Sequence, residues 1–441
     1  MLTFYEIAAA LQAPVSGADF SVTAVVTDSR KATAGCLFAA LEGERVDGHS
    51  FISQLDQQFS PMLFIGTKPM QTKNPYILVS DVRKALGLVA KAYLATLPAK
   101  VIGVTGSVGK TTTKNFILSA LQPAMQVSGT AGNMNNELGV PLTALAVRPE
   151  DRAAVIEMGM RGLGQIEYLT RFITPDVAVI TNIGVAHLEL LGTRENIARA
   201  KLELVDALQG GTALLNGDEP LLRNCTAKPC RYFGLSEGND YRAVGIIGST
   251  FTLCYPEGEL PVTLQVAGEH QIMNALAAFG VGHILGVEPA LLKEGLESFC
   301  GDGRRQFTET VGGVTVIDDT YNASPDSMRA ALKVLACAKG RKIAVLGDML
   351  ELGSYEEEGH RAVGRICAEL GIDTVVAVGQ RAALIHEAAE GTERYYVSTR
   401  EEALPLLEKL VCKGDTLLFK ASNSMGFDRL ANGLKERMKK Q

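Results

Sequence analysis

The chain of 441 residues lacks the features that mark several protein classes. No block of Lys or Arg occurs, and 43 basic against 49 acidic residues leave a net charge of -6, which argues against nucleic acid as the main partner. No apolar run approaches the roughly 20 residues that a membrane-spanning helix needs. The N-terminus carries no basic stretch, so we expect no signal peptide. Internal repeats and low-complexity tracts are also absent.

Cysteine chemistry is equally sparse. The eight cysteines are scattered, and none forms a C-x-x-C pair. Cys225 and Cys230 are closest in sequence, but no His or Cys lies nearby to complete a zinc site. We therefore expect reduced thiols in a cytosolic protein.

What the chain does contain is typical of a globular protein with sizeable cores, since 46% of its residues are hydrophobic and 21% are charged. Its length favours about three domains. Strand and helix patterns alternate along most of the sequence, which predicts an α/β fold. We expect the units to span 1–97, 98–306 and 307–441.

The stretch 101–113 predicts a phosphate-binding loop. An apolar run at its start predicts a buried strand, three glycines follow, and an apolar helical pattern begins at Phe116. Glycines allow backbone N–H groups to face phosphate oxygens, and the helix N-terminus adds partial positive charge. Lys110 would reach the terminal phosphates and Thr111 would bind Mg²⁺. Val104 stands where the strict motif has glycine, so an ordinary strand-to-helix turn is the alternative.

Four apolar runs in the second unit predict strands, at 101–104, 153–156, 177–181 and 212–215. Helical patterns between them indicate a largely parallel sheet with right-handed crossovers. Ligands of such sheets bind beyond the carboxyl ends of the strands, where Glu157 and His187 fall. Because Mg²⁺ prefers oxygen ligands, Glu157 suits it better than His187, for which a hydrogen-bonded loop histidine is the alternative.

Two predicted helices of this unit carry polar candidates. Thr193 is a suitable N-cap for a helix whose apolar face includes Ile197 and Leu204, with Lys201 between them. Composition alone would make Lys201 a solvated lysine. A second helix begins at Gly268, and its Asn274 either hydrogen-bonds an adenine edge or lies on the helix surface.

The third unit predicts a second, Rossmann-like α/β layer, with strands at 314–317, 342–346, 374–378, 394–397 and 416–419. Polar residues follow its first two strands, at 318–322 and 347–353, which favours one cleft facing the second unit. The alternative is that these residues only form turns. Ser324 and Pro325 predict a capped helix start, and 354–357 predicts a capping box.

The first unit is less informative. An apolar run covers 22–26, and the run 37–41, which glycines bracket, predicts a strand. Ser29 and Arg30 could bind an anionic ligand, or they could only form a turn. The amide-rich stretch 129–141 of the second unit is either a substrate loop or a long connection.

Taken as a set, these motifs resemble the Mur ligase family, the enzymes that build the peptide of the cell-wall precursor. Gly103-Val-Thr-Gly-Ser-Val-Gly-Lys-Thr-Thr112 has the family's variant phosphate loop, which accounts for Val104. Three further motifs resemble the member that joins D-alanyl-D-alanine to UDP-N-acetylmuramoyl tripeptide: Gly132-Asn-Met-Asn-Asn-Glu-Leu-Gly-Val-Pro141, Asp318-Asp-Thr-Tyr-Asn-Ala-Ser-Pro-Asp-Ser-Met328 and Leu346-Gly-Asp-Met-Leu-Glu-Leu-Gly353. The D-N-P triplet of the member that adds the third residue is absent.

The resemblance implies roles for single residues. Glu157, His187 and Thr111 match Mg²⁺ ligands, and Lys201 matches a lysine that the family often carries as an N-carboxylate. The other matches are to contacts with ATP (Gly106, Ser107, Gly109, Lys110, Thr111, Thr112, Asn274 and Arg304), its ribose (Asp319), the UDP-sugar (Ser29, Arg30, Gly43, Asp47 and His49), the growing peptide (Asn135, Asn136 and Glu137) and the incoming dipeptide (Asn322, Ser422 and Ser424). Gln271 and Asn423 depart from the family pattern, where Asn and Arg are usual.

The fold and activity implied by the resemblance follow. We expect an N-terminal α/β domain for the UDP-substrate, a central parallel-sheet P-loop domain for ATP, and a C-terminal Rossmann-like domain for the dipeptide. We expect an ATP- and Mg²⁺-dependent amide ligase, a cytoplasmic monomer acting on small molecules. Two alternatives stay open: a sibling ligase such as a folylpolyglutamate-type synthetase, and a P-loop switch that only hydrolyses nucleotide.

Overall fold

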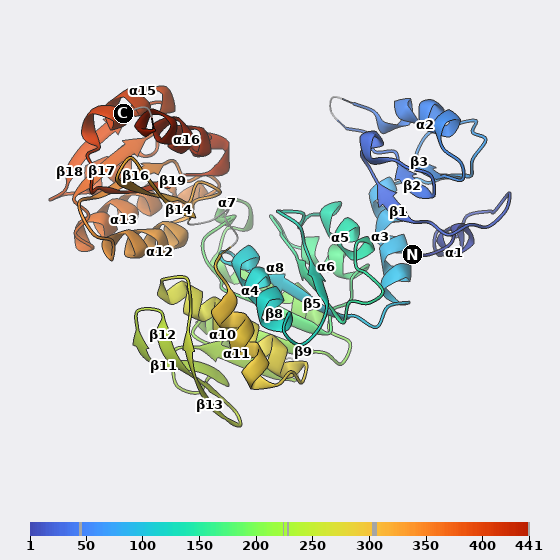
Figure 1. Cartoon of the computed structure of the whole chain (residues 1–441), viewed down its shortest axis with the longest axis horizontal. Helices are drawn as coiled ribbons and strands as arrows, with labels where there is room; N and C mark the ends of the chain where they lie inside the picture. Colours follow the sequence, from blue (N-terminus) through green and yellow to red (C-terminus); the bar gives the residue numbers. More distant parts are fainter. Residues whose placement is uncertain (44–45, 224, 227–228, 302–306, 440–441) are drawn as a thin grey trace.

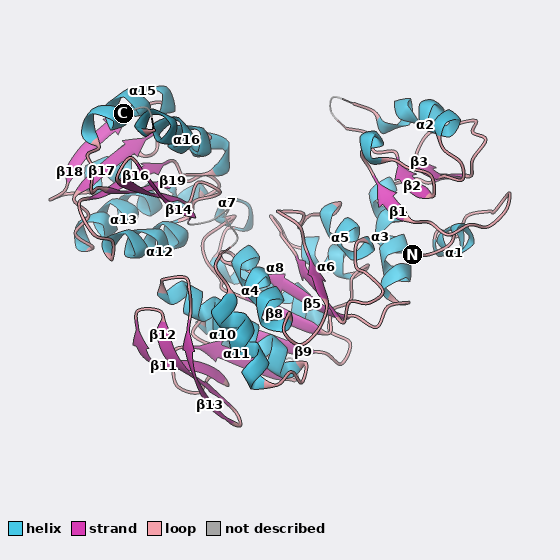
Figure 2. Cartoon of the chain, in the orientation of Figure 1, coloured by secondary structure: helices cyan, strands magenta, loops and turns pink. Residues whose placement is uncertain are grey.

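The chain folds around three separate β-sheets. The computed structural model describes residues 1–43, 46–223, 225–226, 229–301 and 307–439, and its sheets have four, nine and six strands. Figure 1 shows the three sheets in separate bodies, with the nine-stranded one between the other two. Helices flank each sheet (Figure 2), so the predicted α/β class is confirmed.

The first sheet is small and entirely parallel. Its strands follow one another in chain order, namely β1 (Ala24–Val26), β2 (Cys36–Ala39), β3 (Leu63–Gly66) and β4 (Tyr76–Leu78). Helices α1 (Phe4–Ala10), α2 (Ile52–Gln58) and α3 (Val82–Leu94) accompany it. The strand that we predicted at 37–41 is confirmed as β2, and β1 covers the end of the apolar run 22–26.

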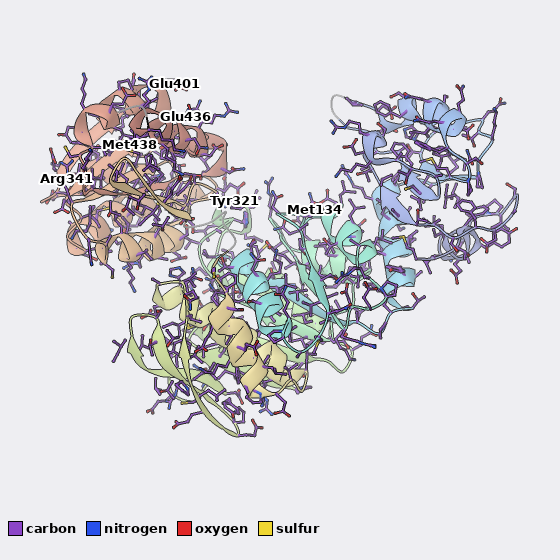
Figure 3. The ribbon with its side chains drawn as sticks, viewed as in Figure 1. Met134, Tyr321, Arg341, Glu401, Glu436 and Met438 are labelled. Carbon is purple, nitrogen blue, oxygen red and sulfur yellow. The ribbon has the colours of Figure 1, made fainter. Side chains whose placement is uncertain are left out.

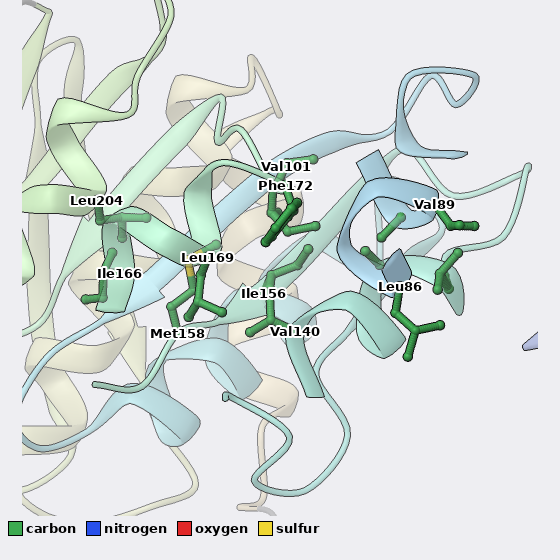
Figure 4. Close-up of a cluster of buried hydrophobic side chains, with 14 of the residues drawn as sticks. Leu86, Val89, Val101, Val140, Ile156, Met158, Ile166, Leu169, Phe172 and Leu204 are labelled. Atoms are coloured by element: carbon green, nitrogen blue, oxygen red, sulfur yellow. The ribbon is translucent and has the colours of Figure 1, made fainter. Parts of the chain in front are cut away.

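Helix α3 joins the first body to the second through a shared hydrophobic core. Its residues Leu86 and Val89 belong to the same buried cluster as Ile156 and Phe172 of the middle body (Figure 4). Gly87 makes the contact close, because a methyl group there would lie 2.6 Å from the Phe172 ring. The first sheet is therefore anchored to the second by packing and not only by the chain.

The nine-stranded sheet has the order β13-β12-β11-β10-β9-β8-β5-β7-β6. The four predicted strands are confirmed as β5 (Lys100–Thr105), β7 (Ala153–Glu157), β8 (Val177–Ile180) and β9 (Thr212–Asn216). Five further strands were not predicted: β6 (Val127–Gly129), β10 (Cys230–Gly234), β11 (Tyr241–Ile247), β12 (Thr250–Tyr255) and β13 (Gly258–Thr263). Pairing is parallel from β6 through β11, and the β11–β12–β13 hairpins are antiparallel.

Helices α4 (Lys110–Leu121), α5 (Gly139–Leu145), α6 (Gln165–Thr170), α7 (Leu188–Leu191), α8 (Arg194–Asp206), α9 (Pro220–Arg223), α10 (Glu269–Ile284) and α11 (Pro289–Ser298) belong to this body. The predicted apolar face of α4 is buried, since Phe116, Ile117, Ala120 and Leu121 are all inaccessible to solvent. Thr193 caps α8 by accepting the Asn196 N–H, as predicted.

The six-stranded sheet has the order β14-β15-β19-β16-β17-β18. Its five predicted strands are confirmed as β15 (Val314–Asp318), β16 (Lys342–Gly347), β17 (Thr374–Val378), β18 (Glu393–Val397) and β19 (Thr416–Lys420). These pair in parallel, and the unpredicted β14 (Phe307–Val311) adds an antiparallel edge. Helices α12 (Pro325–Ala336), α13 (Glu356–Glu369), α14 (Ala383–Ala388), α15 (Arg400–Leu410) and α16 (Phe427–Met438) flank it.

Helix starts in this body confirm one prediction and contradict another. Ser324 forms a capping box at the start of α12, with Pro325 as the first helical residue. The predicted capping box at 354–357 is wrong, because Gly353–Tyr355 forms a 3₁₀ turn and α13 begins at Glu356 with no side-chain cap. Three consecutive glutamates at 356–358 instead place negative charge on the first turn, where the helix dipole favours it.

No helix in the described part of the chain combines the length and apolarity that crossing a bilayer requires.

Candidate active site

One large cleft collects most of the predicted site residues. It encloses about 1860 Å³ and is lined by the phosphate loop, the 133–137 loop, Glu157 and His187 on one side. Residues that follow β15, β16 and β19 line the other side. Figure 3 places Tyr321 of the third body and Met134 of the second on the flanks of this region. The expected single cleft between these two bodies is therefore confirmed.

Two glycines give the phosphate loop its shape. A methyl group on Gly106 would lie 1.8 Å from Thr181 Oγ1, so no larger residue fits there. Gly109 has φ +85° and is the N-cap of α4, a conformation that glycine adopts without strain. This conformation places the N-terminus of α4 at the cleft. The backbone N–H groups of the first turn of α4 have no carbonyl partner within the helix.

The side chains of the loop are arranged for an anion. Lys110 Nζ donates to Gly106 O at 2.8 Å, which holds its ammonium over the loop. The Ser107 hydroxyl is buried and has no hydrogen-bond partner among the described residues, although it lines the cleft. An unsatisfied donor and a cation beside a helix N-terminus fit phosphate oxygens.

Asn182, which sequence analysis missed, holds the same loop from behind. Its Oδ1 accepts the N–H groups of Ser107 at 3.0 Å and Val108 at 2.9 Å. Thr181 adds a bond from its hydroxyl to Val108 O at 2.7 Å. The only signal in the sequence is its place directly after a parallel strand.

Oxygen atoms that could bind Mg²⁺ lie close together beside the loop. Thr111 Oγ1 donates to Glu157 Oε2 at 2.7 Å, and Asn135 Nδ2 donates to Glu157 Oε1 at 2.8 Å. Glu157 is buried at the end of β7. Within the described residues no three His, Cys, Asp or Glu side chains form a metal cluster. A hard cation bound by one carboxylate, one hydroxyl and substrate phosphates fits this donor set.

His187 belongs to the second body and contacts the third body at the edge of the cleft. It has φ +65°, which is uncommon for a non-glycine residue. Its Nδ1 lies 2.9 Å from Glu351 Oε2, a carboxylate of the loop after β16. Burial lowers the pKa of His187, and the Glu351 charge opposes that shift. Neutral histidine is the form that can bind a metal.

Lys201 is buried, so a solvated lysine is wrong for this position. Its side chain is 2% exposed on the inner face of α8. Burial lowers the pKa of Lys201 well below the usual range, and the nearby charge of Lys110 adds to the effect. A lowered pKa favours the neutral form of a lysine amine, and the neutral form is the nucleophile that can take up CO₂ as a carbamate.

Asn274 lines the cleft from α10, so the helix-surface alternative for it is wrong. Its Oδ1 accepts the Thr113 hydroxyl at 2.8 Å, and its Nδ2 donates to Gln271 Oε1 at 3.1 Å. The departure at Gln271 therefore serves to hold the Asn274 side chain. Arg304, the other predicted nucleotide contact on this side, lies outside the described residues.

The wall contributed by the third body rests on a buried ion pair that sequence analysis missed. Lys420 Nζ donates to Asp319 Oδ2 at 2.7 Å and to Asn322 O at 2.9 Å, and its side chain is 3% exposed. Ser422 Oγ accepts the Leu350 N–H at 2.9 Å, which joins the loops after β19 and β16. Asn322, Ser422, Asn423 and Ser424 all line the cleft.

The five residues predicted for the UDP-sugar lie apart from the cleft, on the first body. Arg30 is 87% exposed and pairs with Asp28 at 2.8 Å, and this bond lowers the pKa of Asp28 to about 2. Asp47 Oδ1 lies 2.6 Å from His49 Nδ1, while Lys68 binds its other oxygen. Ser29 opens the 3₁₀ turn that Asp28 caps, and Gly43 N donates to Val46 O.

The cleft extends toward this first body. Asp81 and Arg83, at the start of α3, line it together with Asn136 and Glu137. Arg83 lies 3.9 Å from Glu137. The predicted residues therefore form two groups, one around the phosphate loop and one on the first sheet, and α3 lies between them.

Comparison with known proteins gives one family for the whole chain. The family models described as "Mur ligase family, catalytic domain", "Mur ligase middle domain" and "Mur ligase, glutamate ligase domain" match residues 21–94, 104–282 and 303–423. The UDP-N-acetylmuramoyl-tripeptide--D-alanyl-D-alanine ligase of Bacillus subtilis (strain 168) is 40% identical over 426 residues, covering 93% of each chain.

Solved structures agree with the sequence comparison. MurF from Acinetobacter baumannii superposes with a TM-score of 0.89 at 35% identity, covering 98% of each chain. MurF ligase from Thermotoga maritima in complex with ADP has a TM-score of 0.84 at 29% identity, covering 95% of this chain and 98% of its own. With a relative this similar over nearly its full length, this chain belongs to the Mur ligase family.

Proposed function

We propose that this chain is an ATP-dependent ligase that joins D-alanyl-D-alanine to UDP-N-acetylmuramoyl tripeptide. The observation that carries the proposal is the single cleft with a phosphate loop on one wall and polar strand ends of a second α/β body on the other. Such a cleft can hold a nucleotide, a carboxylate and an amine together. The similarity to ligases of this name supports the choice of substrates.

The proposed reaction forms the amide in two steps. The terminal carboxylate of the tripeptide attacks the γ-phosphorus of ATP, so that an acyl phosphate forms and ADP leaves. The dipeptide amine then attacks the acyl carbon, and a tetrahedral intermediate expels phosphate as the amine loses its proton. Positioning of the reactants can supply several kcal/mol of the barrier, on the order of the 7–11 known for well-oriented groups.

Side chains of the phosphate loop take defined parts in this scheme. Lys110 stabilises negative charge on the phosphoryl group in transfer. Thr111, Glu157 and His187 would hold Mg²⁺, and Lys201 would be a further ligand if its amine carries a carboxylate. The bound cation would neutralise charge on the phosphates. Asn274 orients the nucleotide base, and Asp319 lies near the ribose.

The remaining residues divide the other substrates. Ser29, Arg30, Gly43, Asp47 and His49 bind the UDP-sugar on the first body. Asn135, Asn136 and Glu137 face the peptide as it extends along the cleft. Asn322, Ser422 and Ser424 receive the dipeptide, and Asn423 takes the place of a residue that is often arginine. We propose three domains at 1–97, 98–306 and 307–441, acting as a monomer in the cytoplasm.

The decisive experiment is phosphate release from ATP with each substrate omitted in turn. Release that needs both tripeptide and dipeptide, with a product heavier by the dipeptide less water, is the expected result. Release without either substrate would instead identify a nucleotide switch. Release that needs another amino acid, such as glutamate with a folate, would identify a sibling ligase.

A further inference from the structure

The segment 182–189 lies between the phosphate loop and the third body, and we call it the bridging segment. It leaves the carboxyl end of β8 and leads into α7, which Figure 1 shows between the second and third bodies. Its first residue, Asn182, accepts both N–H groups of Ser107 and Val108. One end of the segment therefore fixes the backbone of the phosphate loop directly.

The middle of the segment touches both neighbours at once. Gly184 is buried so tightly that a methyl group on it would lie 3.2 Å from Ser107 Cβ and 2.5 Å from Asp326 Oδ2. Asp326 belongs to the first turn of α12 in the third body, and its carboxylate faces the backbone of the bridging segment at Gly184. The Val185 side chain packs against the hydrophobic core of the third body.

The far end of the segment is held by the loop after β16. His187 lies 2.9 Å from Glu351, and a methyl group on Gly353 would lie 2.6 Å from Glu189 Cα. His187 and Glu351 have φ of +65° and +63°, and they are two of only three non-glycine residues with positive φ in the described chain. Strained backbone on both sides of one contact indicates that the surrounding structure imposes it.

We propose that the bridging segment couples the position of the third body to the shape of the phosphate loop, and thereby to nucleotide affinity. Asp326 and Glu351 are its positioning residues on one side, and Asn182 is its positioning residue on the other. When the third body docks, its two carboxylates fix the segment, and Asn182 in turn fixes the amides of Ser107 and Val108. A nucleotide that needs this loop geometry binds more tightly to the docked form, and it stabilises docking to the same extent.

Hydrogen exchange of the ligand-free full chain tests the coupling. In the double variant Asp326→Ala/Glu351→Ala, we expect amides of the phosphate loop to exchange at least about fivefold faster than in the wild type, since couplings of this kind span about 5- to 150-fold. Asn182→Ala should speed exchange at least as much, because it removes the acceptor itself. The isosteric pair Asp326→Asn/Glu351→Gln keeps oxygen acceptors and should restore most of the protection.

A matched control removes two carboxylates elsewhere. Glu401 and Glu436 are exposed on the third body, and Figure 3 places both on the side away from α7. Glu401→Ala/Glu436→Ala should leave exchange in the phosphate loop unchanged. Equal acceleration in this control, or wild-type exchange in Asp326→Ala/Glu351→Ala, would overturn the proposal.

Calorimetry with Mg·ADP supplies a second readout. The affinity should fall at least about fivefold in Asp326→Ala/Glu351→Ala and stay unchanged in the control. Unchanged affinity beside faster exchange would refute the link to nucleotide binding. Neither measurement uses the peptide substrates, so failure of the ligase assay would leave this inference standing.

Discussion

At the scale of the residue, some positions of the phosphate loop have no room for a larger side chain. Other positions require a particular charge. Gly106 faces Thr181 without room for a methyl group, whereas Lys110 is defined by the ammonium that it holds over the loop. The two positions therefore fail in different ways when they are changed.

Removing the Lys110 ammonium should strongly slow phosphoryl transfer while the fold survives. We expect Lys110→Ala to lower kcat/KM by about 100- to 1000-fold, the usual effect of losing one stabilising group at a developing charge. Initial rates and thermal unfolding measure the two effects. Lys333→Ala, an exposed lysine of α12, is the matched control and should behave as the wild type. Full activity of Lys110→Ala would disprove the assignment of the loop.

Gly106→Ala should instead disturb the backbone. The added methyl group would meet Thr181 Oγ1 at 1.8 Å, and overpacking of this kind costs about 1–3 kcal/mol. We expect a lower thermal midpoint and weaker ADP binding. In Gly162→Ala the nearest atom would be 3.8 Å away, so this variant should change neither. Wild-type stability and affinity of Gly106→Ala would show that the loop can relax around the methyl group.

Single residues also show how far the sequence can be interpreted. The burial of Lys201 was predictable in principle, because it lies four residues after Ile197 and three before Leu204 on the apolar face of α8. Composition favoured solvent, but helical periodicity decided its position. Asn182 and Lys420 carried no such signal. Their partners are brought to them by neighbouring parallel strands, which only the tertiary fold specifies.

At the scale of the element, the loop after β16 is fastened by a buried histidine. His360 on α13 is inaccessible to solvent, its Nε2 accepts the Met349 N–H at 3.0 Å and its Nδ1 donates to Glu356 O at 2.7 Å. Only neutral imidazole can accept and donate in this way. Burial lowers the pKa of His360, so the folded protein resists its protonation.

This pKa shift predicts a loss of stability in mild acid. The unfolded chain takes up the proton near pH 6.5 and the folded chain only at lower pH, so the free energy of unfolding should fall as pH drops below 6.5. One proton contributes at most about 1.4 kcal/mol per pH unit. The thermal midpoint of the wild type should approach that of His360→Gln between pH 7 and 5. A constant difference between the two proteins across this range would contradict the prediction.

Elements differ in how well the sequence predicts them. The long apolar strands of both large sheets are evident, because burial on two faces requires continuous hydrophobic runs. The β11–β13 hairpins were missed since their burial alternates and one face carries polar residues. The capping box at 354–357 failed because a 3₁₀ turn took the place of the expected cap.

At the scale of the whole molecule, the site residues fall into two groups joined by α3. A ligand that touches both must be long, as a UDP-linked peptide is. In the proposed arrangement the UDP end of this ligand contacts the first body, so weakening that contact should leave ATP binding at the phosphate loop unchanged.

Arg30→Ala should separate the two groups kinetically. Loss of a charge-assisted hydrogen bond to a diphosphate costs about 1.5–3 kcal/mol, so KM for the UDP-substrate should rise at least about tenfold while KM for ATP stays unchanged. Lys31→Ala removes the same charge from the neighbouring exposed position and serves as the control. A parallel rise in both KM values would show that Arg30 acts on the fold and not on the UDP-substrate.

The strand order of the third sheet has a consequence for biosynthesis. β19 lies between β15 and β16, although it is synthesised long after both. Because β15 and β16 each pair with β19 and not with each other, both lack this partner until the ribosome has passed Lys420. The same strand carries Lys420, which sets the wall of the cleft. A polypeptide that stops before Thr416 thus lacks the middle of its sheet and not merely its edge. Only a nearly finished chain can close this body, so an incomplete translation product exposes core strands to proteases and cannot form a working cleft.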